Sequence, residues 1–539
     1  MVDHAPHGKS GSQFDVVIVG AGFAGMYMLH RTRGLGLRAR VFDVADDVGG
    51  TWYWNCYPGA RCDVESMQYS YQFDEELQQE WEWSERYSGQ PEILRYANHV
   101  ADRFNLRDDI QFQTRVESVH FDEANESWTV STDRGDVVSA QFVIMATGCL
   151  SSTNAPEFPG QSDFAGEILH TGQWPREGVD FSGKRVGVIG TGSSGIQAIP
   201  IIAKEAGHLT VFQRTAQYAV PAQNRPLEKD EQAEIKARYP EFRKENSLQP
   251  NGFSLRLPLN EESALDASEA KRKQEYEARW REGGFTFSWS FGDLGTDLDA
   301  NATAGAFVRE KICEIVKDPE TADKLSPETV IGCKRLCLDT GYFETFNRPN
   351  VDLVDIGQEG IDRITASGIE SGGQEHEVDV IVLATGFDAM TGSLLAMDIQ
   401  GRNGLTLGEK WAAGPRTYLG LGVPGFPNLF TISGPGSPSV LTNMIVSIEH
   451  HVDWISNCIA AMKSDGHRTI EATANAENEW VEHVNAVANE TVYPSCNSWY
   501  LGANVPGKPR VFMPLLGFPP YVEKCDEVAS RNYEGFVLG

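Results

Sequence analysis

The sequence predicts an α/β fold made of two Rossmann-like dinucleotide-binding domains with a helical insertion. Two glycine-rich segments of the form GxGxxG carry this prediction, because each lies between an apolar strand and a helix. A stretch rich in charged residues, 227–330, has helical spacing and gives the insertion. With 539 residues and 41% apolar side chains, the chain can form several large cores.

The first glycine-rich segment follows the apolar strand 16–19 and leads, through a helix, to a second strand that ends in Asp43. Its first glycine makes the tight turn, its second lets the backbone approach a pyrophosphate, and its third lets the helix pack on the strand. Asp43 can accept hydrogen bonds from a ribose diol. The residues expected to contact this dinucleotide are Gly20, Gly22, Phe23, Gly25 and Asp43.

The second glycine-rich segment lies between the strands 185–189 and 209–212, and Gln213 and Arg214 then stand where the first segment has an acid. A cation there can pair with a ribose 2′-phosphate, which a carboxylate would repel, so NADPH is the expected ligand. Lys334 can serve as a second partner of that phosphate; the alternative interpretation of Arg214 is a solvated surface arginine. The expected contacts are Gly190, Thr191, Gly192, Ser193, Ser194, Gly195, Arg214, Thr215 and Lys334.

Two dinucleotides in one chain indicate an electron relay in which the first dinucleotide is FAD. Nicotinamide delivers two electrons as hydride, and a flavin can pass them on singly or to oxygen. The chain has no CxxC pair, so the electrons cannot leave through a protein dithiol. The remaining acceptors are oxygen, a quinone or a bound organic molecule.

Two strands that each end in Ala-Thr-Gly, at 146–148 and 384–386, are typical of exits from the two sheets and predict that the second domain is inserted into the first. The insertion 227–330 either caps the nucleotide domains or is a solvated decoration. The expected domains are 1–150, the first part of the FAD-binding domain; 151–226, the first part of the NADP-binding domain; 227–330, the helical insertion; 331–386, the second part of the NADP-binding domain; and 387–539, the second part of the FAD-binding domain.

Composition limits the partners and the compartment. The formal net charge of -30 would repel phosphate backbones and anionic lipid, so neither nucleic acid nor a membrane is expected. Nine scattered cysteines fit a reducing compartment and predict no metal site, and Cys333 and Cys337 are interpreted as ordinary buried thiols. No signal peptide and no bilayer-spanning run are found, so we expect a cytoplasmic protein, monomeric or a small homo-oligomer.

The segment 164–175, FAGEILHTGQWP, fits the pattern FxGxxxHxxxW[P/D] and lies just before the second GxGxxG. With this fingerprint between two GxGxxG segments, the chain resembles the type I Baeyer-Villiger monooxygenases over essentially its whole length. Its sequence motifs are most similar to those of the phenylacetone and steroid monooxygenase branch. The resemblance implies that NADPH reduces FAD, that the flavin forms a C4a-peroxide with O2, and that the peroxide attacks a ketone. A Criegee-type intermediate then gives an ester or lactone.

The resemblance also implies roles for particular residues. Arg335 matches the active-site arginine that stabilises the peroxide and the intermediate, next to NADP, and Asp63 matches the carboxylate beside the flavin that keeps this arginine charged; the alternative is an ordinary ion pair between domains. The other FAD contacts it implies are Thr51, Trp52, Tyr69, Val116 and Met444, and Trp499 is implied on the nicotinamide side of NADP.

Four apolar positions, Cys149, Leu150, Leu441 and Met444, are expected to border a pocket for a small hydrophobic ketone. His170 and Trp174 of the fingerprint are expected to couple rotation of the NADP-binding domain to catalysis, or else to be plain core residues. Two other functions stay open: a flavin monooxygenase that oxidises nitrogen or sulfur, and a nucleotide-sensing flavoprotein that oxygenates no substrate.

Overall fold

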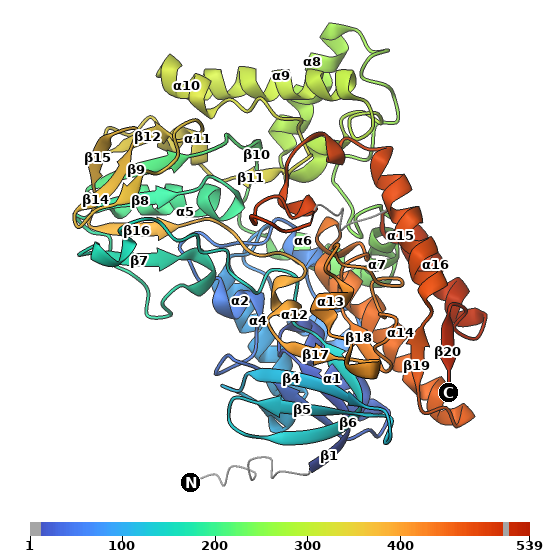
Figure 1. Ribbon diagram of the computed structural model, residues 1–539. Helices are drawn as coiled ribbons and strands as arrows, with labels where there is room; N and C mark the ends of the chain where they lie inside the picture. The colour runs from blue at the N-terminus through green and yellow to red at the C-terminus, as the bar shows by residue number, and fades with distance from the viewer. Residues whose placement is uncertain (1–11, 510–516) are drawn as a thin grey trace.

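The computed structural model describes residues 12–509 and 517–539, so residues 1–11, where no signal peptide is expected, lie outside it. Two sheets dominate the described chain (Figure 1), one near the N-terminus and one that contains β7, β8, β9, β12 and β16. Each is flanked by helices, as the predicted α/β class requires.

The first sheet has eight strands within the described residues, in the order β17-β4-β5-β6-β1-β2-β3, with β18 also paired to β6. Its strands are β1 (Ser12–Val19), β2 (Ala39–Phe42), β3 (Ile110–Gln111), β4 (Val116–Asp122), β5 (Ser127–Thr132), β6 (Val137–Met145), β17 (Asp398–Gln400) and β18 (Leu429–Thr431). Strand β6 pairs antiparallel with β5 along its first half and parallel with β18 along its second. The chain therefore returns to the first sheet after residue 397.

The second sheet is parallel throughout its described strands, in the order β12-β9-β8-β16-β7. These are β7 (Glu167–His170), β8 (Arg185–Ile189), β9 (His208–Gln213), β12 (Val351–Asp355) and β16 (Val380–Leu383). Strands β8, β9 and β16 are almost fully buried, as expected for a parallel sheet covered on both faces. The domain limits drawn from the sequence stay a prediction.

Smaller elements fill the space around the sheets. Two-stranded and three-stranded pieces are formed by β10 (Ala219–Pro221) with β11 (Cys337–Asp339), by β13 (Arg363–Ile364), β14 (Gly368–Ser371) and β15 (Gln374–Glu377), and by β19 (Ile470–Ala472) with β20 (Phe536–Leu538). The helices on and between the sheets are α1 (Phe23–Gly34), α2 (Thr51–Trp54), α3 (Glu75–Glu80), α4 (Gln90–Arg103), α5 (Ser193–Glu205), α11 (Tyr342–Thr345), α12 (Gly392–Leu395) and α13 (Leu407–Lys410). No helix among the described residues is long and apolar enough to cross a membrane.

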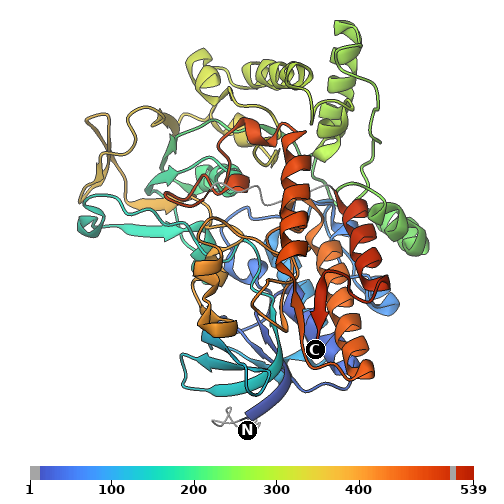
Figure 2. The same ribbon diagram turned by 45° about the vertical axis from the view of Figure 1, so that its right-hand side comes forward.

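The insertion is helical, as its charged text predicts. It contains α6 (Lys229–Ala237), α7 (Tyr239–Ser247), α8 (Glu269–Glu282), α9 (Leu298–Ile315) and α10 (Pro319–Leu325). The later C-terminal helices, α14 (Met444–Asp465), α15 (Ala474–Asn489) and α16 (Phe518–Ser530), stand side by side in Figure 2. The polar face of the insertion is wide, yet its aromatic residues pack into the core of the second sheet, which includes Phe287 and Phe307.

One cysteine prediction is wrong. Cys333 forms a disulfide with Cys496, whereas Cys337 is a buried free thiol as expected. The sequence placed Cys333 near Cys337 and so hid its partner, which is 163 residues away along the chain. Only tertiary packing brings the two sulfur atoms together.

Candidate active site

The first glycine-rich turn accepts only glycine. Gly20 has a φ of +107°, and a Cβ there would lie 2.5 Å from the carbonyl oxygen of Ala146. A Cβ on Gly25 would lie 1.8 Å from the carbonyl oxygen of Gly20, so helix α1 packs directly on the turn. Helix α1 begins directly after this turn at Phe23 with no side-chain cap, and the backbone N–H groups at its N-terminus favour an anion.

Asp43, at the end of β2, braces that turn. Its Oδ2 accepts from the N–H of Ala21 at 2.5 Å, and its Oδ1 from the N–H of Ala45 at 2.7 Å. Burial raises the pKa of Asp43, and these two backbone bonds oppose the rise. Each carboxylate oxygen has a second acceptor site, which suits a ribose diol. Val116 lies near this end of the sheet, since Thr114 donates to the carbonyl of Asp43 at 2.8 Å.

The second turn has the same geometry. Gly190 has a φ of +108°, and a Cβ on Gly195 would lie 2.3 Å from the carbonyl oxygen of Gly190. A Cβ on Gly192 would have nothing within 4 Å, so the open side of this turn can receive a phosphate. Thr191, Ser193, Ser194 and Thr215 surround it; the Thr191 hydroxyl donates to the Thr215 carbonyl, and Ser193 contacts Cys337.

Two cations stand beside the second turn without an anion. Arg214 is exposed and Lys334 is half-buried, and neither side chain makes a hydrogen bond or ion pair with another residue in the part of the chain that the structure describes. Burial lowers the pKa of Lys334, and the charge of Arg214 lowers it further. Two like charges with no counter-ion favour a ribose that carries a 2′-phosphate over one that carries a 2′-hydroxyl.

Aromatic rings wall the space beyond the first turn. The indole Nε1 of Trp52 donates to the hydroxyl of Tyr69 at 3.1 Å, and both side chains are buried. The ring of Phe23 lies edge-on to that of Tyr69, with centroids 6.2 Å apart. Thr51, before Trp52, is exposed and begins helix α2.

Met444 begins helix α14 beside this aromatic wall. The helix is capped by the side chain of Asn443, which accepts from the N–H of Ile445 and donates to the carbonyl of Gln68. This second bond holds the N-terminus of α14 against the residue that precedes Tyr69. The structure thus brings the implied flavin contacts Trp52, Tyr69 and Met444 together.

Arg335 and Asp63 form an ion pair 272 positions apart in sequence. The guanidinium donates from Nε and Nη2 to Asp63 at 3.0 and 2.7 Å, and from Nη1 to the carbonyl of Val440 at 2.9 Å. The side chains are 24% and 28% exposed. Burial works to lower the pKa of Arg335, but the Asp63 carboxylate outweighs it, so the pKa lies above the ordinary value and the guanidinium keeps its charge.

An apolar cluster adjoins the ion pair. Val440, whose carbonyl accepts from Arg335, belongs to this cluster. All four predicted pocket residues and Trp499 lie in it. Cys149 and Tyr500 are among its buried members, and the partly buried side chains packed against them include Leu150, Leu441, Met444 and Trp499. The site therefore combines a fixed positive charge with an apolar, largely buried surface, which can stabilise a developing anion.

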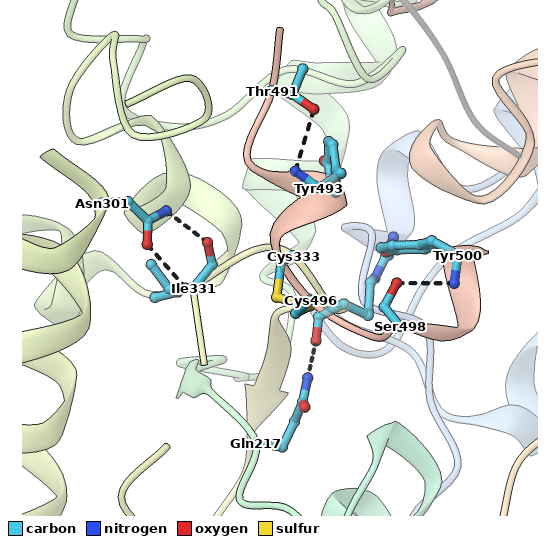
Figure 3. The surroundings of a disulfide bond; sticks show 10 residues. Gln217, Asn301, Ile331, Cys333, Thr491, Tyr493, Cys496, Ser498 and Tyr500 are labelled. Carbon is cyan, nitrogen blue, oxygen red and sulfur yellow. Dashed lines mark hydrogen bonds between the residues drawn. A yellow bond between two sulfur atoms is a disulfide. The ribbon is translucent and has the colours of Figure 1, made fainter. Parts of the chain in front are cut away.

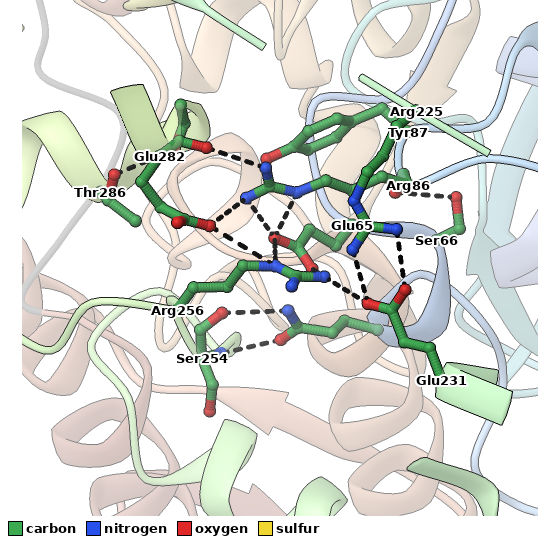
Figure 4. Close-up of polar contacts among 12 residues, drawn as sticks. Glu65, Ser66, Arg86, Tyr87, Arg225, Glu231, Ser254, Arg256, Glu282 and Thr286 are labelled. Atoms are coloured by element: carbon green, nitrogen blue, oxygen red, sulfur yellow. Dashed lines mark hydrogen bonds and ion pairs between the residues drawn. The ribbon is translucent and has the colours of Figure 1, made fainter. Parts of the chain in front are cut away.

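The insertion reaches this site in two ways. The ring of Phe285 lies under the guanidinium of Arg335, with the central carbon 4.9 Å from the ring centre. A charge network (Figure 4), which we name the Glu65 network, links the segment after Asp63 to the insertion. It contains Glu65, Arg86, Arg225, Glu231, Arg256 and Glu282. The insertion is thus in contact with the ion pair and is no solvated decoration.

Within the described residues, His170 and Trp174 make no hydrogen bond to Arg335 or Asp63. His170, at the end of β7, accepts from the N–H of Gly172 at 2.9 Å through Nδ1, and Nε2 lies 3.4 Å from the carbonyl oxygen of Asn154. Burial lowers the pKa of His170, which favours the neutral ring. Trp174 is buried in the core of the second sheet beside Phe181. Their coupling role stays a prediction.

Comparison with known proteins places the chain in a family. Residues 17–239 match a family described as pyridine nucleotide-disulphide oxidoreductase. A Baeyer-Villiger monooxygenase of Pseudooceanicola batsensis is 44% identical over 98% of this chain and 96% of its own length. The chain belongs to the Baeyer-Villiger monooxygenases. A phenazine N-monooxygenase of Lysobacter antibioticus is 42% identical over 98% of this chain and 97% of its own. A solved structure of oxidised steroid monooxygenase bound to NADP is 54% identical, covers 98% and 99% of the two chains, and superposes with a TM-score of 0.93.

This Baeyer-Villiger monooxygenase binds FAD, depends on NADPH and oxidises ketones to esters or lactones. Its two turns fit these two cofactors. The first turn ends in a carboxylate, Asp43, which suits an unphosphorylated ribose, while the second is flanked by Arg214 and Lys334, which suit a 2′-phosphate. Membership of this family, and not the fit of the turns, removes the alternative of a flavoprotein that oxygenates no substrate.

Sequence reasoning missed three contacts of the monooxygenase's arginine. They are the ring of Phe285, the carbonyl of Val440 and the buried phenol of Tyr500. Burial raises the pKa of Tyr500 above its ordinary value, although the charge of Arg335 opposes the rise. Phe285 lies in a segment that the charge pattern marked only as helical. Tyr500 follows Trp499 directly, so the neighbour of an implied contact was the available signal.

Proposed function

We propose that Arg335, kept charged and oriented by Asp63, stabilises the negative charge that develops on the carbonyl oxygen of a hydrophobic ketone during oxygen insertion. A single observation carries this proposal: the guanidinium bonds at once to Asp63 and to the carbonyl of Val440, a member of the apolar cluster. A ketone that packs on that cluster has its carbonyl within the field of a permanent cation.

The chain's own residues divide this work. Arginine has five N–H donors, and three are used on Asp63 and Val440, which leaves N–H groups for Tyr500 and for an oxyanion. The apolar cluster excludes water, which strengthens the charge interaction. Bound FAD, reduced by NADPH, supplies the oxygen-activating chemistry. Because one fixed charge lies beside an otherwise apolar cluster, the site suits a ketone whose carbonyl carries a bulky apolar group.

Ketone panels test the proposal directly. The holoenzyme is given NADPH, ¹⁸O2 and aryl, cyclic, steroid or long-chain aliphatic ketones, and products are examined by mass spectrometry and by base hydrolysis. We expect ketone-dependent NADPH oxidation and an ester that carries one heavy oxygen. The Arg335→Ala variant should still be reduced by NADPH and yield little ester. Undiminished ester from that variant, or hydrogen peroxide as the sole product with every ketone, contradicts the proposal.

Nitrogen oxygenation is the second candidate function. Its support is the phenazine N-monooxygenase, which is about as similar to this chain as the Baeyer-Villiger relative. Phenazine therefore belongs in the same panel. An N-oxide resists base hydrolysis whereas an ester does not, so the two products of equal mass gain can be separated.

We further infer that the enzyme works in the cytoplasm as a monomer or small homo-oligomer and binds neither nucleic acid nor membranes. The net charge of -30 supports the last two points. The Cys333–Cys496 disulfide weighs against the compartment, because disulfides are rare in reducing cytoplasm. Light scattering for the oligomer and cell fractionation for the compartment are the measurements that decide.

A further inference from the structure

The disulfide between Cys333 and Cys496 joins two segments that both contribute to the active site (Figure 3). Cys333 lies two residues before Arg335, and Cys496 lies three residues before Trp499. Their Cα atoms are 6.2 Å apart. The covalent link therefore connects the backbone that positions the guanidinium with the loop that supplies two aromatic residues to the apolar cluster.

The Cys333 end of the link is firmly held. The buried amide of Asn301, on α9, donates to the carbonyl of Ile331 at 2.8 Å and accepts from its N–H at 3.1 Å. On the other side of Cys333, the side chain of Gln217 donates to the carbonyl of Arg335 at 2.6 Å. The backbone around Cys333 is thus fixed to the insertion and to the segment after β9, and can serve as an anchor.

The Cys496 end lies in irregular backbone. Only two short 3-10 turns, Tyr493–Ser495 and Trp499–Leu501, occur in the described residues 490–509. Further along, Asn504 donates to the carbonyl of Phe387 at 2.7 Å and Lys508 forms an ion pair with Asp388. These contacts hold the far end of the loop against the segment 387–389. At the near end the N–H of Val492 donates to the carbonyl of Gly295 at 2.9 Å, and the disulfide ties Cys496 covalently to the backbone just before Arg335.

The placement of Trp499 and Tyr500 depends on the position of this loop. Tyr500 is 2% exposed and lies beside Arg335, and its ring centre is 4.3 Å from that of Trp499. The hydroxyl of Ser498 caps the turn by accepting from the N–H of Tyr500 at 3.1 Å. A loop without ladder hydrogen bonds loses such a position easily once its covalent anchor is removed.

We propose that the Cys333–Cys496 disulfide is a reducible positioning link that holds Trp499 and Tyr500 against Arg335, so that its reduction uncouples NADPH oxidation from ketone oxygenation. The inference rests on the proposed role of Arg335. Cys496 is partly exposed whereas Cys333 is buried, so a dithiol reductant attacks the sulfur of Cys496. The S–S bond breaks, two protein thiols form, and the reductant supplies two electrons and two protons by closing its own disulfide.

Three enzymes test the proposal: the natural chain, the double variant Cys333→Ser/Cys496→Ser, and Cys313→Ser, which removes an exposed free thiol as a matched control. Alkylation of the denatured protein, before and after dithiothreitol, followed by peptide mass analysis, shows whether residues 333 and 496 are linked. Ester, hydrogen peroxide and NADPH are then measured for each holoenzyme, with and without dithiothreitol. Circular dichroism confirms that the double variant is folded.

We expect reduction of the natural chain to raise the fraction of NADPH lost to hydrogen peroxide by roughly threefold to tenfold, because a small misplacement of positioning groups is costly. Reoxidation with oxidised glutathione should restore the coupling. The double variant should be uncoupled from the start and insensitive to dithiothreitol, and Cys313→Ser should behave as the natural chain does. Free thiols at 333 and 496 in the purified protein, or unchanged coupling after reduction, overturn the inference. Absence of ester in every sample instead contradicts the proposed function.

Discussion

Asp63 meets Arg335 through one oxygen only, since Oδ2 accepts from both Nε and Nη2 of the guanidinium. Within the described residues Oδ1 of Asp63 accepts no hydrogen bond. The contact fixes the plane of the guanidinium, and the bond from Nη1 to Val440 fixes its rotation about that contact. A lysine could supply the charge but not this orientation.

Substitutions of Arg335 and Asp63 should therefore lower the rate of ester formation by different amounts. Arg335→Ala should lower kcat for ester formation on the order of 100-fold or more, as for loss of an oxyanion donor, and Arg335→Lys should recover only part of it. Asp63→Asn should fall between them, because the amide still accepts a bond but no longer holds the charge. Steady-state ester formation is the measurement. Glu377→Gln, which removes an exposed partner of Arg185, is the control and should leave kcat unchanged.

Cofactor choice should depend on the two unpaired cations. Removing Arg214 or Lys334 with alanine should raise KM for NADPH roughly tenfold or more, since a charge-assisted hydrogen bond contributes about 1.5–3 kcal/mol. The kcat/KM for NADH should stay nearly constant, because NADH has no 2′-phosphate. Arg134→Ala, which removes an exposed cation in the turn between β5 and β6, provides the control. Equal losses with both cofactors would mean that the cations support the fold instead.

Glu449 should make stability depend on pH in an unusual direction. Burial raises the pKa of its side chain to about 8, against backbone bonds from Gln72 and Phe73, while an ordinary glutamate has a pKa of 4.5. The folded state favours the neutral acid, so the stability that it contributes is complete below pH 4.5 and is lost as pH rises towards 8.

The variant Glu449→Gln stays neutral at every pH and can still accept both backbone bonds. Its Tm relative to the natural chain should therefore increase steadily between pH 5 and pH 8. The exposed residue Glu482 gives the control variant Glu482→Gln, for which we expect no such trend. A constant difference in Tm across the window would show that Glu449 is ionised in the folded protein.

Within the Glu65 network, the most buried cation should matter most for stability. The Arg86 side chain is 4% exposed and bonds to Glu65 at 2.8 Å and to the carbonyl of Glu282 at 2.9 Å. Arg86→Ala leaves Glu65 with Arg256 as its remaining cation, at 3.2 Å, and should lower the free energy of unfolding by about 1.5–3 kcal/mol, as for loss of a hydrogen bond between charged groups. Arg256→Ala, at a 34% exposed position, should cost less. Urea unfolding of both variants measures the order, and the reverse order contradicts it.

Neighbouring residues in the sequence are enough to specify the local parts of the site. The turn from Gly20 to Gly25 depends on the φ angles and the size of neighbouring residues, so the local sequence is sufficient to predict the turn. The class of the fold followed from two such turns between apolar strands. The cation Arg214 at the end of its strand was visible for the same reason, because strand ends in parallel sheets meet the ligand.

Contacts between residues far apart in the sequence depend on the packing of the whole chain. The short spacing suggested that Cys333 and Cys337 are neighbouring thiols, yet Cys333 is bonded to Cys496. Likewise, the charge pattern of the insertion gave no sign that the ring of Phe285 lies beneath Arg335. The pairing of Arg335 with Asp63 came from resemblance to a family and not from pattern. The physical reason is that such contacts are set by the packing of whole sheets and helices, whose relative positions depend on the sum of many weak interactions across the chain.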